Sequence, residues 1–338
     1  MKAILLADER HRNFHVEEFF HVYSDEVLDS IQSLVDLAPA PVYLSRFEEK
    51  RDALRETEII FSNWGMPELG MERVEEFFPR VKAVFYAGGD VRHFASPYFQ
   101  MGARVFATGS ANAVPAAEYT LAHILLAAKG AQRATRHYRD EATYRESREN
   151  TALRPGNFHV TVGIIGVGRV GRRVAELLRH FDATVYACDP FLTPDRARAL
   201  GVQLMSMEEI FQQCDVVTCH LPVWSNLHNA VNEEMLSSMA ENATFINASQ
   251  GEVVDQEALV RVLRERPDLT AILDSTVPYA LPGNHPLHRM DNVFLTPHIA
   301  GSFGGELERM GESIVAALRS YLAGEPSEHE MFRDIMQR

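Results

Sequence analysis

The chain has 338 residues, with 33 Lys and Arg against 47 Asp and Glu, so its formal net charge is −14. This length suggests about two domains, and 46% hydrophobic with 24% charged residues is typical of a globular protein with a large core. The acidity, without a run rich in Lys or Arg, argues against binding to nucleic acid or to an anionic membrane.

The sequence indicates neither a membrane-spanning nor a secreted protein. No apolar run reaches the roughly 18–20 residues of a membrane helix, and the N-terminal apolar stretch is too short for a signal-peptide core. Cys188, Cys214 and Cys219 lie in or beside apolar stretches without metal-ligand spacing. We therefore expect buried, reduced thiols, no metal site and a cytoplasmic protein.

The first third of the chain alternates short apolar runs with amphipathic stretches. This βαβ rhythm predicts a parallel sheet covered by helices on both faces. The predicted strands are residues 3–7, 41–44, 58–63, 83–87 and 104–108, and the helical patterns include residues 16–37 and 67–78.

The middle of the chain departs from this rhythm. One long helix is predicted over residues 115–131, with Pro115 in its first turn, where proline is tolerated. Residues 132–157 follow and are polar, rich in Arg and Glu, and without a predicted strand. Such a segment is a linker, a disordered loop or an arm that reaches another subunit.

Apolar runs return in the second half of the chain. They predict strands at residues 160–165, 184–188, 216–221, 244–247, 271–274 and 293–296. A last helix is predicted over residues 305–323, with Gly324 as its C-cap. The chain is therefore expected to contain two α/β sheets.

A glycine-rich motif follows the strand predicted at residues 160–165 and begins a helical run. Gly166, Gly168 and Gly171 have the G-x-G-x-x-G spacing, and Asp189 ends the next strand, 23 residues after Gly166. This context is the dinucleotide-binding fingerprint, in which the glycines allow a tight turn, backbone contact with a pyrophosphate and close helix packing. Asp189 suits ribose hydroxyls and repels a 2′-phosphate, so we predict NAD rather than NADP.

Four further motifs accompany the glycine loop. They are N-A-V-P-A-A-E from Asn112, H-L-P from His220, N-A-S-Q-G-E-V-V-D from Asn247 and N-V-F-L-T-P-H-I-A-G from Asn292. Together the motifs resemble those of the D-isomer-specific 2-hydroxyacid dehydrogenases, and they are spread over most of the chain.

The resemblance implies an α/β fold of two doubly wound parallel-sheet domains with a cleft between them. A flavodoxin-like substrate-side (catalytic) domain would comprise residues 1–112 and 301–338, and a Rossmann NAD-binding domain residues 113–300. The resemblance also implies a small-molecule substrate and a homodimer, with the long helix and the arm of residues 132–157 at the interface.

A catalytic trio is also implied, and only one of its members is unchanged. In the family an Arg holds the substrate carboxylate, a His exchanges the hydroxyl proton and a Glu hydrogen-bonds that His. Here the His is His298, whereas Gln250 stands at the Arg position and Tyr279 at the Glu position. Since Gln250 is a neutral amide in place of a charged Arg, we expect a loss of about 2–4 kcal/mol of carboxylate binding and carbonyl polarisation. Tyr279 can hydrogen-bond an imidazole but would not stabilise an imidazolium as a carboxylate does.

Further substrate contacts are implied in the first third of the chain. The loop with Gly88, Gly89, Asp90 and Arg92 matches the family position whose backbone N–H groups hold the carboxylate, and its glycines suit an anion-binding turn. Arg92 is a candidate to replace the missing cation. Asn112 matches a position near the substrate in formate-oxidising relatives, or it serves only to begin the long helix.

The resemblance assigns further residues to the cofactor. Asp274 matches the residue that holds the nicotinamide carboxamide. The other implied cofactor contacts are Arg169, Val170, Pro190, His220, Leu221, Pro222, Ala248, Ser249, His298 and Gly301.

Three functions remain open on these grounds. The first is an NAD-dependent oxidoreductase with His298 as acid and base and a substrate unlike a simple 2-oxo acid. The second is an enzyme with tightly bound NAD that oxidises its substrate transiently for elimination or hydrolysis. The third is a non-catalytic NAD(H)-binding sensor.

Overall fold

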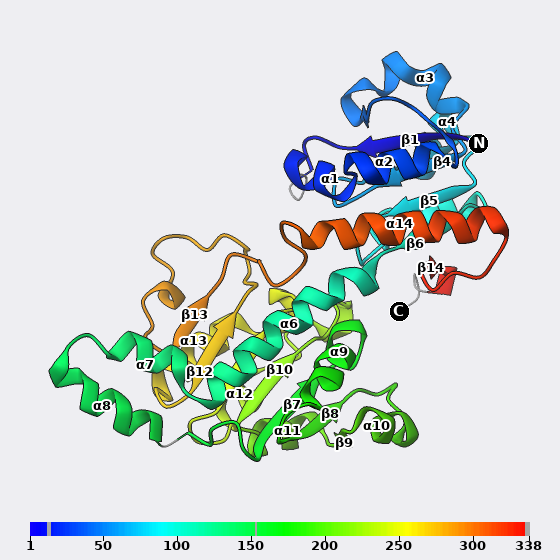
Figure 1. Ribbon diagram of the computed structural model, residues 1–338. Helices are drawn as coiled ribbons and strands as arrows, with labels where there is room; N and C mark the ends of the chain where they lie inside the picture. The colour runs from blue at the N-terminus through cyan, green and yellow to red at the C-terminus, as the bar shows by residue number, and fades with distance from the viewer. Residues whose placement is uncertain (12–14, 153, 335–338) are drawn as a thin grey trace. The chain divides into compact units, whose positions relative to one another are not determined.

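The computed structural model describes residues 1–11, 15–152 and 154–334 (Figure 1). The chain forms two compact units, one of Met1–Asn112 with Ser302–Arg338 and one of Ala113–Gly301. Each unit is built on a twisted, mainly parallel sheet with helices on both faces, which confirms the predicted fold class. That the first unit binds the substrate and the second the cofactor stays a prediction. The cleft between them stays a prediction as well.

The sheet of the first unit has the strand order β14-β6-β5-β4-β1-β2, with β3 paired to β1. All pairings are parallel except that of β14 with β6. The strands are β1 (Lys2–Ala7), β2 (Asp36–Leu37), β3 (Val42–Tyr43), β4 (Ile59–Ser62), β5 (Ala83–Tyr86), β6 (Arg104–Ala107) and β14 (Glu330–Met331). The central strands are buried on both faces, which explains their continuous apolar runs.

Helices enclose a core on each face of this sheet. The helices on one face are α1 (Val16–Val22), α2 (Asp25–Gln32) and α14 (Glu306–Ala323), and those on the other are α3 (Phe47–Arg55), α4 (Met71–Phe77) and α5 (Ala95–Gln100); η1 (Leu44–Arg46) is a 3₁₀ turn. Figure 1 shows α14 lying along β5 and β6. Gly311 allows α14 to approach α1, since a Cβ there would lie 2.1 Å from the Val22 carbonyl oxygen.

The sheet of the second unit has the order β13-β12-β11-β10-β7-β8-β9, and all its pairings are parallel. The strands are β7 (Val160–Ile165), β8 (Ala183–Cys188), β9 (Gln203–Leu204), β10 (Val216–Cys219), β11 (Thr244–Asn247), β12 (Thr270–Leu273) and β13 (Val293–Leu295). The strand order reverses between β7 and β10, and ligands of doubly wound sheets bind at the carboxyl ends of strands at such a point.

The second unit contains most of the remaining helices. They are α6 (Gly109–Ala128, which begins in the first unit), α7 (Ala131–His137), α8 (Glu141–Ala152), α9 (Arg169–Leu178), α10 (Pro194–Leu200), α11 (Met207–Gln213), α12 (Glu233–Ser237) and α13 (Gln256–Glu265). Three 3₁₀ turns accompany them, η2 (Ser225–Leu227), η3 (Gly251–Val253) and η4 (Pro286–His288).

Three helix predictions need correction. Residues 16–37 form two helices and a strand, because Tyr23 leaves the helical backbone region and Ser24 caps a new helix. Residues 67–70 are not helical, and α4 begins after Gly70, whose backbone is extended. The long helix begins at Gly109, so Pro115 lies inside it rather than in its first turn. Its missing N–H therefore removes one intrahelical bond.

Residues 132–157 are not the predicted linker or disordered loop, since α7 and α8 occupy most of the segment. Polar anchors hold α7 to its own unit. Arg136 donates from Nη1 to the Met290 carbonyl at 2.7 Å and lies over the Phe294 ring at 4.2 Å. Because such anchors leave no apolar periodicity, the sequence did not show them. The role of the segment as an arm to another subunit stays a prediction.

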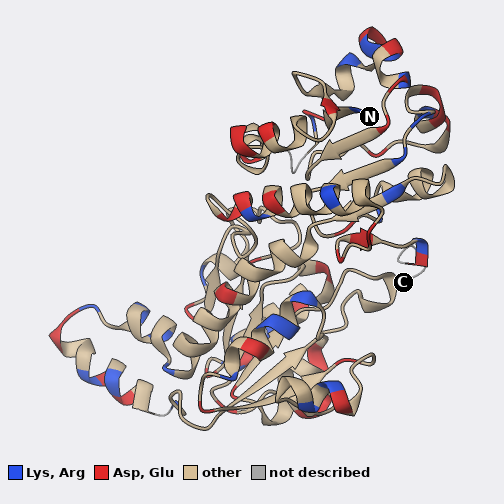
Figure 2. Ribbon diagram, turned by 45° about the vertical axis from the view of Figure 1, so that its right-hand side comes forward, with Lys and Arg blue, Asp and Glu red and all other residues tan. Residues whose placement is uncertain are grey.

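Charged residues are dispersed over the surface. Figure 2 shows Lys and Arg mixed with Asp and Glu along the helices of both units. Within the described ranges, no helix combines the length and the apolar character needed to cross a membrane, and no His, Cys, Asp and Glu side chains gather in a group that could hold a metal. The three cysteines are free. Cys214 and Cys219 are buried, but Cys188 is only half-buried, which corrects the prediction for that residue.

Candidate functional site

The glycine loop connects β7 to α9, and two of its glycines are required by the backbone. Gly166 has a φ of +85°, a left-handed conformation, and a Cβ there would lie 2.9 Å from the carbonyl oxygen of His220. A Cβ at Gly171 would lie 2.0 Å from the carbonyl oxygen of Gly166. A side chain at Gly166 would therefore collide with the backbone after β10, and one at Gly171 would push α9 away from the loop.

Gly168 is different, because the space beside it is open. It is the N-cap of α9, no side chain caps the helix there, and a Cβ would meet no atom within 4 Å. The space beside Gly168 is therefore open at the positive end of the α9 helix dipole. This arrangement suits a phosphate group.

Asp189 fixes the shape of the loop. Its Oδ2 accepts a hydrogen bond from the Val167 N–H and its Oδ1 one from the Phe191 N–H, both at 2.8 Å. A carboxylate has further lone pairs, so the predicted bond to ribose hydroxyls is compatible with these contacts. Burial lowers the pKa of Arg169 at the start of α9, Val170 packs against the core, and Pro190 is exposed.

His220 lies beside this loop, at the end of β10. Its backbone N–H donates to the Ile165 carbonyl at 2.7 Å, and its ring Nε2 lies 3.0 Å from the Thr218 hydroxyl. Burial lowers the pKa of His220 to about 4, so the imidazole is neutral at pH 7. Its buried Nδ1 has no hydrogen-bond partner among the described residues. A buried polar atom usually has one, so this atom fits contact with a bound molecule.

The three catalytic positions predicted from the sequence come together in the second unit. The Tyr279 hydroxyl donates a hydrogen bond to Gln250 Oε1, and the rings of Tyr279 and His298 lie 4.9 Å apart between centroids. Gln250 is half-buried, whereas the His298 side chain is 52% exposed. These residues follow β11, β12 and β13 and so lie at the carboxyl edge of the sheet.

Asp274 holds the loop that carries His298. This buried carboxylate accepts hydrogen bonds from the Thr296 hydroxyl at 2.6 Å and from the N–H groups of Ile299 and Ala300 at 2.9 Å. Its Oδ2 lies 4.0 Å from Nδ1 of His298, and its backbone carbonyl accepts from the His298 N–H at 3.0 Å. The predicted contact of Asp274 with the nicotinamide stays a prediction, since much of its hydrogen-bonding capacity is already used.

Sequence reasoning missed two residues behind this loop. The Tyr119 hydroxyl on α6 lies 2.7 Å from the Thr296 hydroxyl, which in turn donates to Asp274. Burial raises the pKa of Tyr119 to about 12, so it remains a neutral hydrogen-bonding group. The T-P-H motif contains Thr296, but no local pattern pairs it with a helix 177 residues away.

The other residues expected at the cofactor lie on loops near the ends of the strands. Ser249 Oγ donates to Asn247 Oδ1 at 2.8 Å, and Asn247 Nδ2 donates to the Gln250 carbonyl at 3.0 Å. These bonds fix the backbone around Ala248. Half-buried positions on neighbouring loops are Leu221, Pro222 and Gly301.

The predicted substrate loop lies in the first unit, after β5. Gly88 leaves room for the Tyr86 ring, whose Cε1 would be 2.4 Å from a Cβ, and Gly89 follows it. Arg92 forms an ion pair with Asp90, with Nη2 and Oδ2 at 2.6 Å, so the candidate replacement cation is already bound to a carboxylate. Asn112 Oδ1 accepts from the Ser302 N–H at 3.0 Å, which is a structural role. Contact of these residues with a substrate stays a prediction.

The fold and the glycine loop define a two-domain, doubly wound protein of the dinucleotide-binding class. Residues 121–300, more than half of the chain, match the sequence profile "D-isomer specific 2-hydroxyacid dehydrogenase, NAD binding domain". The chain belongs to this family, and its cofactor is NAD.

Individual relatives show how far the similarity extends. D-3-phosphoglycerate dehydrogenase of Mycobacterium leprae is 32% identical over 226 residues, 66% of this chain and 42% of that protein. Glyoxylate reductase of Thermofilum pendens is 35% identical over 166 residues, 49% of each chain. The chain therefore spans about two fifths to half of the length of these relatives. Apo D-mandelate dehydrogenase of Rhodotorula graminis has the same fold, with a TM-score of 0.80 at 19% identity and 98% coverage of both chains.

Proposed function

We propose that the protein is an NAD-dependent oxidoreductase that transfers a hydride between the nicotinamide and a hydroxy or oxo substrate lacking a carboxylate at the usual position. The observation that carries this proposal is the hydrogen bond between Tyr279 and Gln250 beside His298. It forms a neutral pair where the family has an Arg and a Glu.

The residues around the glycine loop would hold the cofactor. The N-terminus of α9 would bind the pyrophosphate above Gly168, Asp189 would bind the ribose, and His220 would contact the dinucleotide through Nδ1. The nicotinamide supplies the hydride acceptor or donor when the cofactor is bound. His298 would exchange the substrate's hydroxyl proton at Nε2, because its Nδ1 is the nitrogen that faces Asp274.

Gln250 would contact the substrate as a hydrogen-bond donor. Its Oε1 accepts from Tyr279, which leaves the amide N–H groups for a substrate oxygen. An amide cannot compensate the charge of a carboxylate, so a carboxylate there would be bound more weakly by about 2–4 kcal/mol than by an Arg. A hydroxyl-rich or weakly charged carbonyl compound fits this pair better.

The state and location of the protein are part of the proposal. A homodimer through residues 132–157 is supported by the paired, exposed rings of Tyr138 and Tyr144, whose centroids lie 5.5 Å apart. Exposed aromatic residues are common at protein interfaces. Free cysteines support a reducing, cytoplasmic environment.

The test is NADH oxidation with a panel of hydroxyketones, aldehydes and 2-oxo acids. We expect turnover of an uncharged carbonyl compound, and a loss of at least about a hundredfold in His298→Asn, since the proton-exchanging group is removed. Asn tolerates the left-handed backbone at this position, where φ is +58°. The matched variant His180→Asn, at an exposed position of the same unit, should retain full activity.

Other outcomes would support the alternatives. Saturable NADH binding without turnover of any compound would indicate a sensor. Turnover that needs bound NAD without net change in NADH would indicate transient oxidation. Equal activity of His298→Asn and the wild type would contradict the assignment of His298.

A further inference from the structure

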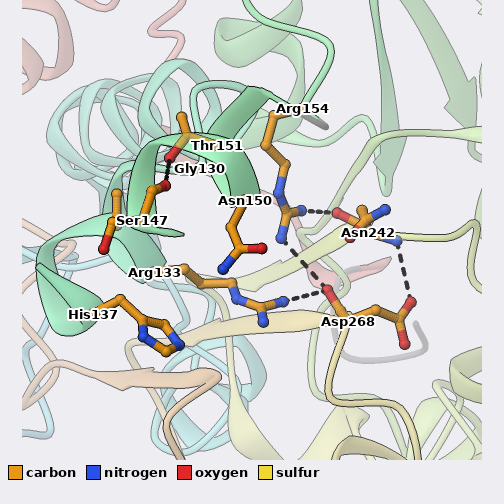
Figure 3. Close-up of a pocket in the computed structure, with 10 residues that line it drawn as sticks. Gly130, Arg133, His137, Ser147, Asn150, Thr151, Arg154, Asn242 and Asp268 are labelled. Atoms are coloured by element: carbon orange, nitrogen blue, oxygen red, sulfur yellow. Dashed lines mark hydrogen bonds between the residues drawn. The ribbon is translucent and has the colours of Figure 1, made fainter. Parts of the chain in front are cut away.

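A small polar cavity lies in the second unit, beside helices α7 and α8 and the loops of Asn242 and Asp268 (Figure 3). Its volume is about 160 Å³, which exceeds what a single water molecule needs. The side chains that line it include Arg133, His137, Asn150 and Arg154. None of the residues assigned above to substrate or cofactor lines this cavity.

Two guanidinium groups lie close together here, and both are hydrogen-bonded to neutral backbone carbonyl oxygens. Arg133 Nη1 donates to the Asp268 carbonyl at 2.7 Å, and Arg154 Nη2 lies 3.5 Å from the same oxygen. Arg154 Nη1 donates to the Asn242 carbonyl. Figure 3 shows both guanidinium groups turned toward the Asp268 backbone. Within the described part of the chain, neither group has a carboxylate within 4.0 Å.

The one carboxylate that lines the cavity is already paired. Asp268 accepts from Arg266 at 2.7 and 2.9 Å and from the Asn242 N–H at 3.1 Å. Burial, and then the charge of Arg133, lowers the pKa of Arg154 to about 10, and the group is still charged at pH 7. Two positive charges therefore lie together near a single carboxylate, that of Asp268, which attracts Arg154 but is already hydrogen-bonded to Arg266.

The local backbone maintains this arrangement. Gly130 ends the turn after α6 with a φ of +65°, and a Cβ there would lie 2.9 Å from Cγ of Arg154. The glycine thus leaves space for the arginine to reach the cavity. Ser147 also lines the cavity, and its buried Oγ has no hydrogen-bond partner among the residues described.

We propose that this cavity binds a small oxyanion of the phosphate or carboxylate type. Each guanidinium has five N–H donors, and the bonds to carbonyl oxygens use only one or two of them. The remaining donors, with the Asn150 amide, can surround an oxyanion and compensate the two charges.

The test is calorimetric titration with inorganic phosphate, and separately with acetate, at constant ionic strength. We expect saturable binding to the wild type, and Arg154→Gln should weaken it at least about tenfold. Since Arg154 also bonds backbone carbonyls, a second variant avoids a folding defect. Asn150→Asp changes an exposed residue of α8 and places a carboxylate beside the guanidinium groups, so it should weaken binding at least tenfold without lowering Tm.

Arg145→Gln provides the matched control, because this residue lies on α8 but does not line the cavity. It should bind phosphate as the wild type does. The comparison of phosphate with acetate distinguishes the two kinds of oxyanion. Absence of saturable binding at concentrations on the order of 10 mM, or equal binding by Asn150→Asp, would overturn the proposal. The proposal would also be overturned if the wild type formed a dimer that phosphate does not affect and Arg154→Gln were monomeric. A second copy would then fill the cavity.

Discussion

An alanine at position 168 should lower the affinity for NADH by about tenfold to a hundredfold, which corresponds to about 1.4–2.8 kcal/mol. The added methyl group would point into the open space at the N-terminus of α9, where a Cβ meets no protein atom within 4 Å. It would therefore displace the pyrophosphate rather than any part of the protein. Fluorescence titration with NADH measures the effect.

The control for Gly168→Ala is Gly70→Ala. Gly70 is also an uncapped helix N-cap with open space beside it, and it lies in the first unit, remote in sequence from the glycine loop. Both variants lose a glycine N-cap, which costs about 1 kcal/mol or less of stability. Equal NADH affinity of the two variants would show that the dinucleotide does not lie over Gly168.

Restoring the charged pair with Gln250→Arg and Tyr279→Glu should raise NADH oxidation with glyoxylate, pyruvate or hydroxypyruvate at least about tenfold. An Arg would bind the substrate carboxylate, and a Glu would favour the protonated imidazole of His298, whose ring lies beside position 279. Tenfold corresponds to about 1.4 kcal/mol, less than the 2–4 kcal/mol expected for a charged contact in a desolvated site. The measured quantity is kcat/KM for each oxo acid.

Both single variants are needed for this experiment. Gln250→Arg alone removes the acceptor of the Tyr279 hydroxyl, and Tyr279→Glu alone places a carboxylate against the Gln250 amide. The gain in kcat/KM of the double variant, expressed as a free energy, should therefore exceed the sum of the gains of the two single variants. Gln203→Arg makes the same chemical change on exposed β9 and should leave kcat/KM unchanged. No gain in the double variant would mean that the loss of charge at these positions does not determine the substrate.

The sequence predicted the sheets better than the segments between them. Strands such as β4 and β11 are buried on both faces, so they appear as continuous apolar runs. The two-residue strands β2, β9 and β14 are too short to have a pattern. The helices of residues 132–157 were missed because α7 buries no residue and α8 only Ser147, so neither shows apolar periodicity; α7 is held instead by polar anchors such as Arg136.

The candidate site was predictable to the extent that it lies in local motifs. The glycine loop, His298 and the neutral residues at positions 250 and 279 could all be located in the sequence. Their relations depend on the fold. The bond from Tyr279 to Gln250, and the path from Tyr119 through Thr296 to Asp274, join segments far apart in the chain. The sequence does not show that Arg92, the candidate cation, pairs with Asp90.

The most direct test of the proposed function is to follow the hydride itself, with NADH deuterated at C4 of the nicotinamide. The product of an uncharged carbonyl substrate should carry one deuterium at the former carbonyl carbon when it is examined by mass spectrometry. His298→Asn should form this product at least about a hundredfold more slowly. NADH that binds tightly while no compound of the panel acquires deuterium would contradict the account and leave a protein that binds the cofactor without using it.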